Sequence, residues 1–131
     1  MTEILCYEDS YMREFEATVT DVIESGIVLD RTSFYPGGGG QPCDTGVIEW
    51  DGESSQITQV SRIEGKLVHK VDGPIPDLGN SIKGRLDWIK RYQLMRTHTA
   101  LHILCGVVWR DFGAQVTGGN MTPLHARMDF E

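Results

Sequence analysis

The sequence has few cysteines and no long apolar run, and each of these features excludes a class of protein. Its three cysteines, Cys6, Cys43 and Cys105, form no C-x-x-C pair and no disulfide framework. They fit a reducing compartment. No stretch approaches the ~18 apolar residues that a membrane-spanning helix needs, and the acidic N-terminal residues have the wrong sign for a signal peptide. We therefore expect a cytoplasmic protein with no membrane partner.

The sequence also lacks an excess of positive charge, since its net charge is −7 at pH 7. This balance argues against a protein that coats nucleic acid through overall charge alone. A local basic cluster is nevertheless present, opposed only by Asp87, and it consists of Lys83, Arg85, Lys90, Arg91 and Arg96. Gathered on one face, these side chains would bind phosphates. A solvated strand end and helix face would explain the cluster equally well.

Short alternating segments separated by turns occupy residues 1–86. Phe15, Ala17 and Val19 fall on one side of their segment, and this period of two predicts a half-buried strand. Turn signals between further strands occur at Ser25-Gly26, Asp51-Gly52 and Glu64-Gly65. The number and spacing of these segments predict a small antiparallel β-barrel or sandwich over residues 1–86.

A loop with four consecutive glycines, from position 37 to position 40, interrupts these strands and is flanked by Pro36 and Pro42. Such a run is not regular strand interior, and glycine permits positive φ angles and close backbone approach. The loop could therefore present N–H groups to a ligand. A flexible linker is the alternative, although aromatic residues and prolines make these flanks stiffer than a linker. The spacing matches neither a P-loop nor a dinucleotide-binding fingerprint.

From Trp88 the hydrophobic period changes from two to 3.6, which predicts a helix capped by Asp87 and ended by Gly113. One stripe of this helix carries Leu94, His98, Leu101, His102, Cys105, Val108, Trp109 and Phe112. Because His98 and His102 are four residues apart, both imidazoles can point at one spot and form half of a zinc site. Satisfied core histidines are the alternative. Cys105 lies about 10 Å from His98 along the axis, too far to share one metal with both.

Beyond the helix we expect a turn at Gly118-Gly119-Asn120 and one strand over residues 125–130. One helix and one strand can hardly close a core. Residues 87–131 are therefore expected to be a truncated part of a second domain, which makes the fold class α+β.

Three motifs in order resemble those of alanyl-tRNA synthetase editing domains and their free-standing AlaX relatives. The glycine-rich motif is Thr32-Ser33-Phe34-Tyr35-Pro36 with Gly38-Gly39-Gly40-Gln41-Pro42, Asp44 and Gly46. The helix motif is Asp87-Trp88, Arg91, Met95-Arg96, His98-Thr99-Ala100 and His102, and the strand motif is Ala126-Arg127-Met128-Asp129-Phe130. Together they cover roughly residues 15 to 130 and are specific, although H-x-x-x-H alone is a weak signal.

The resemblance implies an N-terminal β-barrel followed by part of an α+β editing domain shared with threonyl-tRNA synthetase. It implies hydrolysis of the ester that joins serine or glycine to alanine-specific tRNA, tRNA(Ala), whose acceptor end would be the partner. Zinc would be held by His98 and His102 together with a later Cys-x-x-x-His pair. The sequence ends before such a pair, so we expect a truncated chain.

The same resemblance implies roles for the remaining candidate residues. The Thr32 hydroxyl would face the substrate side chain. There it could form a hydrogen bond with the hydroxyl of serine, whereas the methyl group of alanine offers no such bond. The pocket wall would be shaped by Gly37, Gly38, Gly39, Gly40 and Gln41. The tRNA acceptor end would meet Lys83, Arg85, Lys90, Arg91 and Arg96. Without the resemblance, Thr32 is a plain strand-edge threonine.

Two other functions stay open at this stage, and no Asp or Glu is an obvious general base. The chain could be a non-catalytic tRNA-binding or scaffold module that keeps the barrel and half a metal site. It could also be an unrelated metallohydrolase, but H-x-x-x-H hydrolases carry a glutamate where Thr99 stands here.

Overall fold

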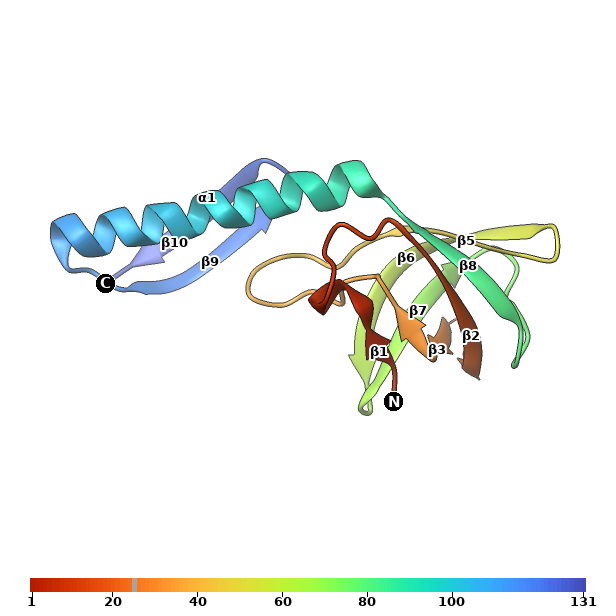
Figure 1. The fold of residues 1–131 in the computed structure, drawn as a ribbon. Helices are drawn as coiled ribbons and strands as arrows, with labels where there is room; N and C mark the ends of the chain where they lie inside the picture. Colours follow the sequence, from red (N-terminus) through yellow and green to blue (C-terminus); the bar gives the residue numbers. More distant parts are fainter. Residues whose placement is uncertain (25) are drawn as a thin grey trace. The chain divides into compact units, whose positions relative to one another are not determined.

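The computed structural model describes residues 1–24 and 26–131 (Figure 1). The chain divides into two compact units. The barrel unit comprises residues 1–37 and 43–88, and the helix unit comprises residues 38–42 and 89–131. The tip of the glycine-rich loop therefore belongs to the same unit as the two helical histidines. The turn predicted at Ser25-Gly26 falls partly outside the described residues.

Six strands of the described chain close into an antiparallel barrel in the order β2-β3-β7-β6-β5-β8. Their bounds are β2 (Glu14–Ile23), β3 (Gly26–Leu29), β5 (Gly46–Trp50), β6 (Glu53–Ile63), β7 (Lys66–Asp72) and β8 (Ser81–Leu86). A short parallel pair, β1 (Glu3–Ile4) and β4 (Arg31–Thr32), forms a separate sheet, and the 3₁₀-helix η1 (Leu5–Tyr7) follows β1. The predicted barrel is confirmed.

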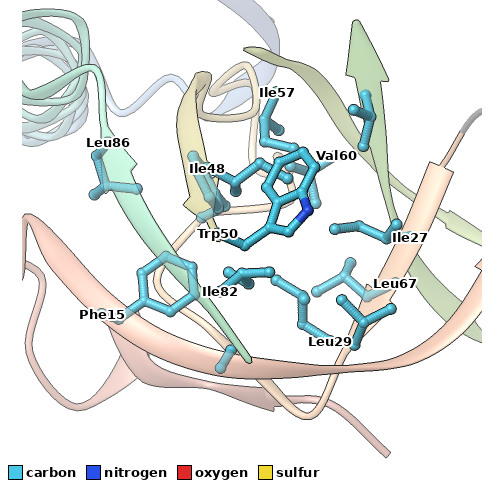
Figure 2. Packing of buried hydrophobic residues seen from close by; sticks show 14 residues of the cluster. Phe15, Ile27, Leu29, Ile48, Trp50, Ile57, Val60, Leu67, Ile82 and Leu86 are labelled. Atoms are coloured by element: carbon cyan, nitrogen blue, oxygen red, sulfur yellow. The ribbon is translucent and has the colours of Figure 1, made fainter. Parts of the chain in front are cut away.

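Alternation along the strands fills the barrel interior. In β2, Phe15, Ala17 and Val19 are buried while their neighbours are exposed, as a period of two requires. Figure 2 shows the side chains of several strands converging around the Trp50 indole. The buried cluster consists of Phe15, Ala17, Val19, Ile27, Leu29, Phe34, Ile48, Trp50, Ile57, Val60, Leu67, Val71, Ile82 and Leu86.

Two of the three turns predicted within the barrel form hairpins at the expected dipeptides. Asp51-Gly52 joins β5 to β6 with φ angles of 46° and 78°, and Glu64-Gly65 joins β6 to β7 with 50° and 78°. Positive φ at both central residues characterises a type I′ turn, whose twist matches that of the flanking strands. These turns fix the register in which the alternating residues point inward.

The helix unit contains the predicted helix, α1 (Trp88–Phe112), whose first residue is counted with the barrel unit. Gly113 ends α1 with a φ of 65°, and its N–H donates to the carbonyl of Trp109 at 2.9 Å, which is a glycine C-terminal cap. The predicted stripe is buried at Leu94 and Leu101, which pack with Met121. Further along, Trp109 and Phe112 are exposed. Among the described residues, no helix has the length and hydropathy to cross a bilayer.

The segment after α1 differs from the prediction. Two strands, β9 (Val116–Thr122) and β10 (His125–Phe130), form an antiparallel hairpin. The turn predicted at Gly118-Gly119-Asn120 is wrong, because these residues lie within β9 and pair with Asp129, Met128 and Arg127. The chain reverses instead beyond Thr122, where Leu124 has a φ of 61°. The α+β fold class is confirmed, with two strands after the helix rather than one.

Candidate functional site

The stem of the glycine-rich loop is closed by Asp44. The Tyr35 N–H donates to Oδ2 of Asp44 at 2.7 Å, and the Asp44 N–H donates to the Tyr35 carbonyl at 2.9 Å. Asp44 is almost fully buried. A buried carboxylate is retained where its oxygens find donors, so this residue of the motif holds the two ends of the loop together.

The tip of the loop is a tight turn between Gly38 and Gln41. The N–H of each residue donates to the carbonyl of the other at 3.0 Å. Between them Gly39 and Gly40 have φ angles of 60° and 83°, the left-handed region in which glycine carries no steric cost. A Cβ atom on Gly40 would lie 3.6 Å from the carbonyl oxygen of Gly119. The tip is therefore a folded turn that lies close to β9, and not a flexible linker.

Gln41 brings the turn to the predicted metal ligands. Its side-chain Oε1 lies 2.9 Å from Nδ1 of His98, and the residue is only 9% exposed. One helical turn further, the His102 ring stacks on the His98 ring, with centroids 4.9 Å apart and planes 19° apart. His98 is half-buried and His102 is exposed. The structure thus places both candidate ligands and one residue of the glycine-rich motif together.

The donor chemistry of this pair fits half of a zinc site. Zinc takes four ligands in a tetrahedron, and imidazole nitrogen is one of its common donors. In the part of the chain that the structure describes, no group of three or more His, Cys, Asp or Glu side chains is arranged to hold a metal. Cys105 is engaged elsewhere, since its Sγ donates to Sδ of Met128 at 3.3 Å. His98 and His102 can therefore supply two ligands of a site that needs more.

Thr32 lies in the barrel unit and is fully buried. Its hydroxyl lies 2.9 Å from Nε2 of His69, and His69 Nδ1 lies 3.3 Å from the Ile27 carbonyl. A carbonyl only accepts, so Nδ1 carries the proton and Nε2 accepts from the threonine hydroxyl. The same hydroxyl oxygen accepts the Phe34 N–H at 3.1 Å. The contact predicted between Thr32 and the substrate stays a prediction.

His69 is held neutral by this surrounding. Burial lowers the pKa of its imidazole from 6.5 to about 4, although its hydrogen bonds to the Ile27 and Leu67 backbone act in the opposite direction. A neutral ring is what the network requires, because a protonated Nε2 could no longer accept from Thr32. Sequence patterns give no sign of this partnership, because 37 positions separate the two residues.

The predicted basic residues have different surroundings. In the barrel unit, Lys83 pairs with Glu14 across 3.4 Å, and Arg85 pairs with Glu49. In the helix unit, Arg91 is only 2% exposed, whereas Arg96 is exposed and borders a hollow of about 350 Å³ beside Leu101. Their contact with tRNA stays a prediction.

Comparison with known proteins gives the relationship directly. Residues 3–90 match the family model described as tRNA synthetases class II (A). The alanyl-tRNA editing protein AlaX-M of Saccharolobus solfataricus is 43% identical over 134 residues, which cover 99% of this chain and 56% of that protein. The alanine–tRNA ligase of Pyrococcus abyssi is 46% identical over 131 residues, 98% of this chain and 14% of that protein. The chain belongs to the alanyl-tRNA synthetase editing-domain and AlaX family.

Membership in this family accounts for the motifs that the sequence displays. The AlaX-M protein of Methanosarcina barkeri is a further relative, 44% identical over 137 residues. The chain spans about half the length of the AlaX-M relatives that it matches. In this member of the family, the glycine-rich turn contacts the H-x-x-x-H helix through the hydrogen bond between Gln41 and His98.

Proposed function

We propose that the protein removes wrongly attached amino acids from tRNA(Ala) by hydrolysing the ester bond, with serine or glycine as the amino acid removed. The observation that carries the proposal is the pair of stacked helical imidazoles with a glycine-rich-motif side chain hydrogen-bonded to one of them. The pair belongs to a chain whose relatives are named for alanyl-tRNA editing and alanine–tRNA ligation. Imidazoles on a rigid helix suit a metal-assisted hydrolase.

His98 and His102 would hold the metal, and zinc is the proposed ion because imidazole nitrogen is one of its common donors. Zinc supplies Lewis-acid polarisation or a more acidic bound water when it is present. Of the two, His98 is half-buried and His102 is exposed.

The glycine-rich motif would form the substrate-binding side of the site. Gly38, Gly39 and Gly40 lack side chains, so backbone groups of the turn can come close to an aminoacyl ester. The acceptor end of tRNA(Ala) would meet basic side chains. Lys83 and Arg85 would then exchange their exposed carboxylate partners for phosphates, at little cost because such surface ion pairs are weak.

The proposal is tested by assaying the complete natural polypeptide on Ser-tRNA(Ala), Gly-tRNA(Ala) and Ala-tRNA(Ala), together with zinc analysis. We expect hydrolysis of the first two and its loss after chelation, restored by zinc. His98→Ala and His102→Ala should each lower the rate about 100-fold or more, because loss of a ligand exceeds the 10–100-fold cost of outer-shell changes. His125→Ala, an exposed histidine outside the pair, is the matched control.

Other outcomes of the same assay would assign a different function. Binding of tRNA without hydrolysis would reject the enzyme and favour a non-catalytic tRNA-binding module. Activity that survives both chelation and the two alanine variants would separate the reaction from the histidine pair.

Thr32→Val tests the proposed recognition of the substrate hydroxyl. Valine has the shape of threonine without its hydroxyl, so a substrate-facing Thr32 predicts a larger loss of Ser-tRNA(Ala) hydrolysis than of Gly-tRNA(Ala) hydrolysis, by about 10-fold for one hydrogen bond. The ratio of the two kcat/KM values is the measurement. Equal losses, together with a lower free energy of unfolding, would assign the hydroxyl to its buried partners His69 and Phe34.

A further inference from the structure

The contact between Gln41 and His98 fixes where the imidazole proton lies. The amide oxygen Oε1 of Gln41 is an acceptor only, and it lies 2.9 Å from Nδ1 of His98. In the neutral ring Nδ1 is therefore the protonated nitrogen, and Nε2 keeps its lone pair. Among the described residues, no group is hydrogen-bonded to Nε2 of His98.

The position of the acceptor is set by the turn that carries it. Gln41 is joined to Gly38 by two backbone hydrogen bonds of 3.0 Å. The intervening glycines adopt left-handed φ angles, and Gly40 lies against the backbone of Gly119. A side chain that starts from so constrained a backbone and is 9% exposed loses little further entropy when it holds the imidazole.

We propose that Gln41 is a positioning residue that holds His98 in the Nδ1–H tautomer, so that Nε2 faces the metal. A histidine binds a metal through its unprotonated nitrogen, and a hydrogen bond at the other nitrogen decides which one that is. In water a histidine ring favours the opposite, Nε2–H tautomer. This assignment rests on the part of the proposed function in which His98 and His102 bind a metal. It gives the glycine-rich turn a second role, which is to orient a metal ligand on a helix that is distant in sequence.

The tautomer is measured without metal. Long-range ¹H–¹⁵N correlation spectra of the complete natural polypeptide, at a pH where imidazoles are neutral, distinguish the two forms of His98. We expect Nδ1–H in the wild type and in Gln41→Glu, whose carboxylate also accepts from Nδ1, and predominantly Nε2–H in Gln41→Leu. Gln115→Leu, which changes an exposed glutamine of the same unit, should leave the spectrum of His98 unchanged.

Zinc affinity, measured by competition with a chromogenic chelator, gives the second readout. Gln41→Leu should bind zinc about 10–100-fold more weakly than the wild type, the usual cost of removing an outer-shell partner. Gln41→Glu should restore most of the affinity, which a merely structural defect would not allow.

Several results would overturn the assignment. One is Nε2–H at His98 in the wild type, which would mean that the Gln41 amide donates to Nδ1. Another is a Gln41→Leu variant with an unchanged His98 tautomer or unchanged zinc affinity.

The deacylation assay distinguishes this assignment from the proposed function. If the wild type has the Nδ1–H form and binds zinc tightly but does not hydrolyse the ester, the proposed function alone is wrong. If the protein hydrolyses the ester but the His98 tautomer does not change in the Gln41→Leu variant, this assignment alone is wrong.

Discussion

Lowering the pH from about 7.5 to about 4 is expected to reduce the free energy of unfolding of the barrel by about 3 kcal/mol through His69 alone. Burial lowers the pKa of His69 in the folded chain from 6.5 to about 4. Between these values the unfolded chain binds a proton that the folded chain does not. The stabilisation is therefore complete above pH 6.5 and is lost as the pH falls from 6.5 through 4.

Denaturant titrations at a series of pH values measure this effect. Tryptophan fluorescence in a Trp109→Phe background reports on the barrel, because Trp50 and Trp88 both belong to that unit. His69→Gln should lower stability at neutral pH and remove most of the slope between pH 6.5 and 4. His125→Gln, which changes an exposed histidine, should keep the slope. If the wild type and His69→Gln lose stability in parallel, carboxylates are responsible instead.

The same buried histidine is connected by hydrogen bonds to the start of the glycine-rich loop. His69 accepts from Thr32, and Thr32 accepts from the Phe34 N–H. The next residue, Tyr35, donates its N–H to Asp44. Consecutive backbone donors at the start of the glycine-rich loop are thus satisfied by side chains of the barrel unit. Protonation of His69 would remove the acceptor of the Thr32 hydroxyl proton. Because the oxygen of that hydroxyl accepts the Phe34 N–H, acid should loosen the loop stem along with the barrel.

Local sequence signals were enough to predict most of the barrel and the start of α1. Asp51-Gly52 strongly favours a type I′ turn, and the burial of Phe15, Ala17 and Val19 follows from strand alternation alone. Gly118-Gly119-Asn120 gave the wrong answer because its turn propensity is real but is overridden by pairing with β10. Propensity is decided locally, whereas strand pairing depends on the partner strand.

The site was predictable only in part, for the same reason. The spacing of His98 and His102 is a helical property and can be read directly. The meeting of Gln41 with His98 joins residues 57 positions apart, and no local pattern encodes it. The burial of Arg91 likewise depends on tertiary packing, since a basic residue in a polar stretch of sequence reads as exposed.

Replacing Gly46 with alanine should destabilise the barrel by about 3 kcal/mol or more, at the upper end of overpacking costs. A Cβ atom at this position would lie 2.1 Å from the carbonyl oxygen of Arg85 and 2.9 Å from Cε1 of Phe34. Gly46 pairs with Ile57 on one side and Leu86 on the other. Because β5 is hydrogen-bonded to both neighbours in a closed barrel, the Arg85 backbone can move away only by breaking the ladder.

Gly106→Ala is a control variant that should change the free energy of unfolding in the opposite direction. Gly106 lies inside α1, and a Cβ atom there would meet nothing within 4 Å. Alanine is favoured over glycine in a helix interior by up to about 1 kcal/mol, so this variant should be slightly more stable than the wild type. Thermal unfolding of the two variants should therefore shift in opposite directions. A Gly46→Ala protein that melts with the wild type would show that the β5–β8 ladder yields easily, and that Gly46 serves the motif in some way other than close strand packing.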